Sequence, residues 1–168
     1  MAQLNPFEIF GIPVKFDIDR EGLEAKFIEI QKRVHPDKFA GATDAEKRVA
    51  QQWAILINEA YQKLRDPLSR GKLICELKGH KVNEDSSGSL DEDFLLDQLE
   101  RREKIDDAIS SGDTEEVEAL KKAVGIEEQI LIGEIQNELD ELKDYERAAA
   151  SLQKLMFLNR QSAELSKG

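Results

Sequence analysis

The residues with the clearest chemical potential are a histidine and an aspartate on either side of a proline, His35-Pro36-Asp37. Proline fixes its own backbone angle φ, so both polar side chains are presented with little conformational freedom left to lose on binding. A carboxylate such as that of Asp37 can accept two charge-assisted hydrogen bonds from an arginine of a partner. The alternative is purely structural: the proline ends a helix, and Asp37 hydrogen-bonds a nearby backbone N–H.

Three cations precede this tripeptide, namely Lys26, Lys32 and Arg33. Lys26 and Arg33 are seven residues apart, so on a helix they lie nearly on one face and flank its apolar stripe, with Lys32 farther round. Such a face could attract an acidic surface of a partner. The alternative is an ordinary solvated face, because isolated surface charges contribute little.

Caps and prolines predict four helices in the first 80 residues, at about 7–10, 20–34, 44–64 and 67–78. The second helix must end near residue 34, because Pro36 cannot continue a helix and the residue before a proline avoids the α conformation. The third helix opens with the capping box Thr43-Asp44-Ala45-Glu46. Its apolar face consists of Val49, Trp53, Leu56, Ile57, Ala60, Tyr61 and Leu64.

A polar stretch at 80–89, containing Gly and Ser, coincides with a change in charge. Residues 1–80 hold 13 Lys and Arg against 12 Asp and Glu, a net charge of +1, whereas residues 81–168 hold 11 against 23, a net charge of −12. We therefore expect a linker at 80–89 between two modules with different partners. The acidic half would repel a phosphate backbone, which argues against nucleic acid as a partner.

Three longer helices are expected after the linker, at about 90–110, 114–142 and 144–165. The first would start at the box Ser89-Leu90-Asp91-Glu92, and the glycines Gly125 and Gly133 could interrupt the second. Three amphipathic helices with short connections favour an antiparallel bundle. The chain as a whole is therefore expected to be all-α.

Two apolar stripes separate on the 90–110 helix. Phe94, Ile105 and Ile109 form the expected core face, while a second stripe starts with three leucines and continues in carboxylates. On the last helix, Phe157 falls well off the expected core face of Tyr145, Ala148, Leu152, Met156 and Ala163. An exposed apolar patch rimmed by acid indicates a partner site. Alternatively, a leucine of this stripe packs against the first module and Phe157 fills a corner of the bundle. The second stripe consists of Leu95, Leu96, Leu99, Glu100, Glu103 and Asp107.

An enzyme is the competing class of function. One cysteine, Cys75, and two histidines cannot form a Cys/His zinc cluster, and there is no Gly-rich phosphate loop or nucleophile motif. We therefore expect no catalysis, no metal and no cofactor. No apolar run reaches the roughly 20 residues of a membrane helix, and the N-terminus has no secretory signal pattern. With a single cysteine, these features predict a cytoplasmic protein without a membrane partner.

The first module, expected at 1–79, resembles a J-domain. The opening Pro6-Phe7-Glu8-Ile9-Phe10-Gly11-Ile12, the loop His35-Pro36-Asp37-Lys38-Phe39 between two helices, and the ending Ala60–Pro67 carry this resemblance. It implies an antiparallel helical hairpin with short flanking helices that docks on a DnaK-type ATPase chaperone. By the same resemblance, the docking residues are His35, Pro36, Asp37, Lys26, Lys32 and Arg33.

Over its whole length the chain resembles the HscB family, the co-chaperones of iron–sulfur cluster assembly. Residues 94–103 and 154–158 are similar to two scaffold-binding motifs of that family. The resemblance implies an L-shaped molecule whose C-terminal bundle, at 90–168, binds the scaffold protein IscU, while its J-domain stimulates the ATPase of the chaperone HscA. The implied scaffold-binding residues are Leu95, Leu96, Leu99, Glu100, Glu103, Asp107 and Phe157.

Two departures from the family pattern are mild: Leu96 stands where methionine is common, and Asp107 where glutamate is common. The chain also lacks the cysteine-rich zinc module that some relatives carry at the N-terminus. The closest alternative function is a general J-domain co-chaperone for other clients. General members tend to carry Gly/Phe-rich or zinc-bearing client regions, and neither occurs here.

Overall fold

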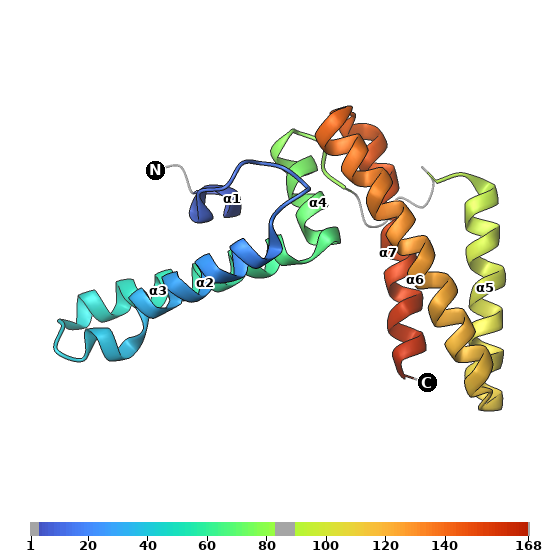
Figure 1. Cartoon of the computed structure of the whole chain (residues 1–168), viewed down its shortest axis with the longest axis horizontal. Coiled ribbons are helices and arrows are strands. Elements are labelled where there is room, and N and C mark those ends of the chain that lie inside the picture. The colour runs from blue at the N-terminus through green and yellow to red at the C-terminus, as the bar shows by residue number, and fades with distance from the viewer. Residues whose placement is uncertain (1–3, 83–89, 168) are drawn as a thin grey trace. The chain divides into compact units, whose positions relative to one another are not determined.

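The computed structural model describes residues 4–82 and 90–167, and every regular element in these ranges is helical (Figure 1). The expected all-α fold is therefore confirmed. The chain divides into two compact units, Met1–Leu73 and Ile74–Gly168. Most of the expected linker, at 83–89, lies outside the described residues. No helix in the described ranges has the length and apolar character needed to cross a membrane.

The first unit is built on a helical hairpin of α2 (Arg20–Val34) and α3 (Asp44–Arg65), with the short helix α1 (Pro6–Phe10) packed against both. A 3-10 turn, η1 (Pro36–Phe39), lies between the two hairpin helices (Figure 1). Phe27 of α2 stacks on Tyr61 of α3, with ring centres 4.0 Å apart. The buried side chains of this unit include Phe7, Phe10, Phe16, Leu23, Ile57, Ala60 and Leu64.

Local capping explains where these helices begin and end. The Asn5 side chain accepts a hydrogen bond from the Glu8 N–H at 3.0 Å, and Thr43 Oγ1 accepts one from the Glu46 N–H at 3.2 Å. Each bond satisfies one N–H that the helix itself leaves unpaired. Helix α1 ends at Gly11, whose φ of +63° lies in the left-handed region that glycine adopts without strain.

Only part of the apolar face of α3 is buried. Ile57, Ala60 and Leu64 are buried, but Val49, Trp53 and Leu56 are 53%, 42% and 39% exposed. The reason is the small number of covering elements. Helix α3 is about 33 Å long and α1 only about 8 Å at 1.5 Å per residue, so α1 covers a fraction of the hairpin.

Helix α4 (Pro67–Leu77) follows α3 after the expected Asp66-Pro67 start, and the Asp66 carboxylate accepts a hydrogen bond from the Ser69 N–H at 3.0 Å. The division between the two units falls within this helix, after Leu73. Its last turn therefore belongs to the second unit, where the buried Cys75 thiol lies 3.8 Å from the carbonyl oxygen of Tyr145.

The second unit is a three-helix bundle of α5 (Glu92–Ser111), α6 (Thr114–Gln136) and α7 (Tyr145–Lys167) (Figure 1). Each of the three helices contacts the other two. A π-helical turn, η3 (Asn137–Glu141), extends α6. The bundle core includes Ile105, Val124, Ile135, Leu152, Leu155, Leu158 and Leu165.

Details of this bundle differ from the sequence-based expectations. Helix α5 is capped by Asp91, whose carboxylate accepts from the Phe94 N–H, and the expected box residue Ser89 lies outside the described residues. Ile109 is 37% exposed, and Ala163 is exposed as well, so neither belongs to the core. The α6 helix passes through both of its glycines, and its geometry changes only at Asn137.

Candidate functional sites

The histidine–proline–aspartate loop forms a tight, exposed corner at the end of α2. His35 ends α2 and also caps η1, because its Nδ1 accepts a hydrogen bond from the Asp37 N–H at 3.2 Å. The Asp37 carboxylate lies 3.6 Å from that nitrogen and is 92% exposed. The loop is therefore held by the histidine ring and the proline, which leaves the carboxylate facing solvent.

The structure separates the three predicted cations. Lys26 donates a hydrogen bond from Nζ to the Phe10 carbonyl at the end of α1, and Arg33 pairs with Glu29 one turn earlier at 2.7 Å. Lys32 instead lines a groove beside the loop. Of the three, only Lys32 therefore shares a surface with the tripeptide.

We call this hollow the corner groove; it has a volume of about 650 Å³ and is open to solvent. His35, Pro36 and Asp37 form one side of it, and Lys32 and Lys38 add two positive charges. Sequence reasoning missed Lys38, although it directly follows the tripeptide. The remaining lining residues are Ile28, Gln31, Val34 and Ala54.

A second hollow of about 330 Å³, almost entirely apolar, lies at the same end of the hairpin. Val34 lines both hollows, and Phe39, Val49 and Trp53 line the second one. Val49 and Trp53, from the apolar face of α3, thus form exposed apolar surface next to the corner groove. Their pattern of spacing did not reveal this, because an apolar stripe looks the same whether or not a third helix covers it.

The leucine stripe of α5 and Phe157 of α7 form the candidate site of the second unit. Leu96 and Leu99 are 55% and 56% exposed, so neither is a core residue. Phe157 is half-buried and meets Phe94 edge-on, with ring centres 6.0 Å apart. Leu95, Leu99 and Phe157 line one groove of about 320 Å³, which we call the α5–α7 groove.

The other predicted residues of this site lie outside the lining of the α5–α7 groove. Glu100, Glu103 and Asp107 are all exposed on α5, spaced so that they continue from Leu96 along the helix. The structure therefore divides the predicted residues into two groups. Leu95, Leu99 and Phe157 line the groove. The others form what we call the outer strip of α5, which consists of Leu96, Glu100, Glu103 and Asp107.

Sequence reasoning missed the polar side chains of the α5–α7 groove. These are Gln98, Arg102, Arg160, Gln161 and Glu164. A signal was present for two of them: Arg102 follows Leu95 by seven residues and Arg160 follows Phe157 by three, so each shares a helix face with a predicted residue. Gln98 and Gln161 could not be paired in advance, because their contact joins helices 63 positions apart.

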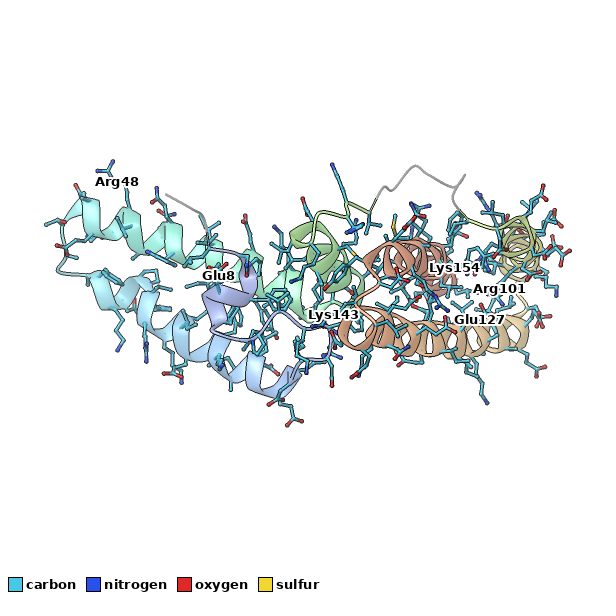
Figure 2. The ribbon with its side chains drawn as sticks, turned by 90° about the horizontal axis from the view of Figure 1, so that it is seen from above. Glu8, Arg48, Arg101, Glu127, Lys143 and Lys154 are labelled. Atoms are coloured by element: carbon cyan, nitrogen blue, oxygen red, sulfur yellow. The ribbon has the colours of Figure 1, made fainter. Side chains whose placement is uncertain are left out.

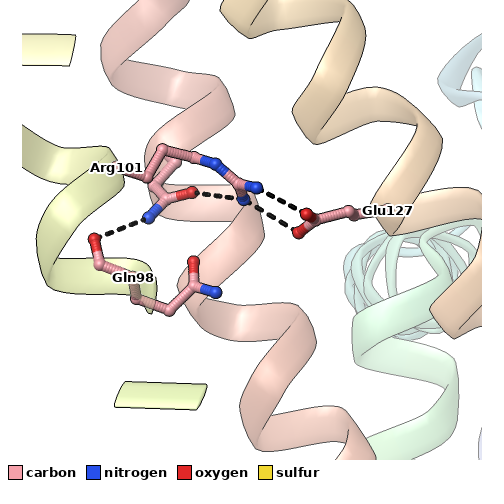
Figure 3. A network of polar contacts seen from close by, with 4 residues as sticks. Gln98, Arg101 and Glu127 are labelled. Atoms are coloured by element: carbon pink, nitrogen blue, oxygen red, sulfur yellow. Dashed lines mark hydrogen bonds and ion pairs between the residues drawn. The ribbon is translucent and has the colours of Figure 1, made fainter. Parts of the chain in front are cut away.

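A polar network fastens the three helices next to this groove (Figure 3). Arg101 of α5 donates two hydrogen bonds to the Glu127 carboxylate of α6, one of them at 2.8 Å, and these bonds raise the pKa of the guanidinium above its usual value. Gln161 of α7 bonds both Arg101 and the main-chain carbonyl of Gln98. Figure 2 shows Arg101 and Glu127 side by side within the bundle. The network makes the groove a preformed surface.

Comparison with known proteins gives the same architecture. Residues 90–166 match the family described as the HSCB C-terminal oligomerisation domain. A co-chaperone protein HscB homolog of Burkholderia thailandensis is 40% identical over 159 residues, which cover 95% of this chain and 90% of the relative. The chaperone HscB of Vibrio cholerae is 32% identical, with a TM-score of 0.86 over 98% of this chain and 96% of that one.

The human co-chaperone protein HscB also shares the fold, with a TM-score of 0.91 over 99% of this chain and 83% of that structure, at 24% identity. These structures consist of a J-domain followed by a C-terminal helical domain, and this chain shares that arrangement, which defines a class of two-domain co-chaperones. Within that class, the chain belongs to the HscB family.

Proposed function

We propose that this co-chaperone serves iron–sulfur cluster assembly: its C-terminal unit binds the scaffold protein IscU, and its J-domain docks on the DnaK-type chaperone HscA and stimulates ATP hydrolysis there. The chain itself contributes no catalysis and acts in the cytoplasm. The observation that carries the proposal is that each unit exposes side chains suited to bind a partner, the Asp37 carboxylate in one and the apolar Leu96 and Leu99 in the other.

The geometry of the corner groove supports docking on the chaperone. An exposed carboxylate held by a rigid loop can accept a bidentate hydrogen bond from an arginine, and little conformational entropy is lost because proline already fixes the backbone. Lys32 and Lys38 would attract an acidic surface of the chaperone. The neighbouring apolar hollow around Trp53 would add buried contact area.

The exposed leucines of α5 support scaffold binding by the second unit. Apolar side chains that are more than half exposed contribute little to the bundle core, but they form favourable contacts when a partner covers them. Two sites on one chain raise the effective concentration of scaffold at the chaperone. Docking would then favour hydrolysis while the scaffold is presented to the peptide-binding site of the chaperone.

One pair of variants tests the proposal. Asp37→Asn keeps the size of the side chain but removes its charge, so it should abolish stimulation of the HscA ATPase and leave IscU binding unchanged. Leu96→Ala with Phe157→Ala should weaken IscU binding by about 2–4 kcal/mol in calorimetry. Normal stimulation by the first variant, or normal affinity of the second, would contradict the corresponding half of the proposal.

The matched control is Ile126→Ala with Ile130→Ala on α6, because these side chains are 53% and 60% exposed and lie outside the α5–α7 groove. This change removes a similar amount of exposed apolar surface. It should leave IscU affinity unchanged. Circular dichroism should show the same helix content for all variants.

A further inference from the structure

The α5–α7 groove contains two arginines, although it belongs to the strongly acidic half of the chain. Arg102 and Arg160 both line it, one from each helix. Within the described ranges, neither guanidinium has a hydrogen bond or an ion pair; that of Arg160 lies 5.8 Å from the centre of the Phe157 ring. Glu164 lines the same groove without pairing with either arginine. The groove therefore holds positive charge that the protein itself leaves unneutralised.

The groove also contains a buried polar group without a partner. Gln98 is only 6% exposed, and its side-chain oxygen Oε1 has no hydrogen bond in the described structure. In Figure 3 the main-chain oxygen of Gln98 accepts a hydrogen bond, while no dashed line reaches its side-chain amide. Buried acceptors are normally satisfied. Because this oxygen has almost no accessible surface, it can receive a donor from a bound segment only after the Gln98 side chain turns into the groove.

The two unpaired arginines and the unsatisfied Gln98 oxygen lie beside the apolar surface of Leu95, Leu99 and Phe157. A guanidinium recognises a carboxylate by two parallel hydrogen bonds, which gives orientation as well as affinity. The combination fits a segment that offers an apolar side chain, a carboxylate and an N–H donor. The carboxylates of the outer strip, Glu100, Glu103 and Asp107, lie outside the groove lining. They suit a positively charged part of the partner.

We propose that the α5–α7 groove binds an acidic–apolar segment of the scaffold. Arg102 and Arg160 donate hydrogen bonds to its carboxylate, and Gln98 Oε1 receives an N–H once the Gln98 side chain turns into the groove. This inference rests on the proposed binding of a scaffold by the second unit. It adds that the scaffold must bring negative charge to the groove and positive charge to the outer strip. Charges of both signs fix the orientation of the complex, since a reversed partner would place like charges together.

The test is calorimetry of the full chain with purified IscU. Arg102→Ala with Arg160→Ala should raise Kd about 10- to 100-fold, because charge-assisted bonds to carboxylate are lost. The affinity of this variant should also depend less on salt than that of the unchanged chain. The matched control, Lys122→Ala, removes an exposed cation of α6 outside the groove and should leave Kd unchanged.

Comparison with Leu96→Ala plus Phe157→Ala separates the two proposals. If the apolar variant binds weakly and the arginine variant binds normally, the inference is wrong and scaffold binding stands. The arginine variant removes two charges and the lysine variant one. If log Kd rises in the lysine variant by half as much as in the arginine variant, the effect is one of net charge and the inference is again wrong. If neither the apolar nor the arginine variant changes Kd, both proposals fail. Neither arginine contacts a protein carboxylate, so their removal should cost the bundle only the contact of Arg160 with the Phe157 ring, and circular dichroism should show unchanged helix content.

Discussion

At the residue scale, the two candidate sites present their key side chains in different ways. The Asp37 carboxylate is exposed because the loop is held by the main chain of this residue: the Asp37 N–H donates a hydrogen bond to His35 Nδ1. Leu96 and Leu99 are exposed because the contacts of α5 with α6 and α7 use other faces of that helix. One site is thus a rigid polar point, and the other is an apolar surface with charged surroundings.

The single cysteine illustrates the opposite situation, a reactive group made inert by its surroundings. Cys75 is fully buried, and burial together with the nearby Glu138 charge raises the pKa of its thiol to about 11 from an ordinary value of 9.0. At pH 8 the thiolate fraction should therefore be about 100-fold below that of an unfolded cysteine, at tenfold per pKa unit.

We predict that iodoacetamide at pH 8 modifies Cys75 at least about 100-fold more slowly in the native chain than in guanidinium chloride. Burial adds to the effect of the pKa, because the reagent must also reach the sulfur. Mass spectrometry at timed intervals measures both rates. Equal rates would show that the last turn of α4 is open in the native protein.

At the element scale, the helix boundaries could be read from the sequence because caps act locally. Asn5, Asp19, Thr43 and Asp113 each cap a helix through a residue three positions later, so their role is visible in a short window. Exposure could not be read in this way. Whether Trp53 or Ile109 is covered depends on elements elsewhere in the chain. Ile109 was expected in the core, yet both side chains are exposed.

The candidate sites follow the same rule. The residues of the corner loop are contiguous, so the sequence and its resemblance to a J-domain are enough to name them as candidates. The groove formed by α5 and α7 needs helices that are far apart in sequence, and only the structure brings Arg102 and Arg160 together with Leu95. Short-range geometry is thus encoded in spacing, whereas a groove depends on the packing of distant helices.

Two glycines of the bundle should respond to alanine with opposite signs. Gly112 ends α5 with φ of +69°, where a Cβ is strained, so Gly112→Ala should lower the free energy of unfolding by about 1 kcal/mol. Gly125 lies inside α6 with open space at its Cβ position, so Gly125→Ala should raise it by about 0.5–1 kcal/mol. Urea denaturation measures both changes, and changes of the same sign would contradict the assigned helix boundaries.

At the scale of the whole molecule, the boundary between the two units predicts how stable fragments of the second unit should be. The second unit includes the end of α4 and the buried residues Ile74, Cys75 and Val82, which precede the bundle helices. We predict that fragment 74–168 unfolds at a higher urea concentration than fragment 90–168. Each buried apolar side chain contributes about 1.5–3 kcal/mol, so several kcal/mol separate the two fragments. Equal midpoints would show that these residues do not stabilise the bundle.

The central claim is that one chain connects the scaffold to the chaperone, and a mixing experiment tests it most directly. The full chain carrying Asp37→Asn keeps its scaffold surface, and the chain carrying Leu96→Ala with Phe157→Ala keeps its corner groove. Mixed in equal amounts with HscA and IscU, they should give no more ATPase stimulation than the sum of their separate effects, because the high effective concentration of a single chain is lost. Recovery of the full stimulation of the unchanged chain by the mixture would contradict the claim.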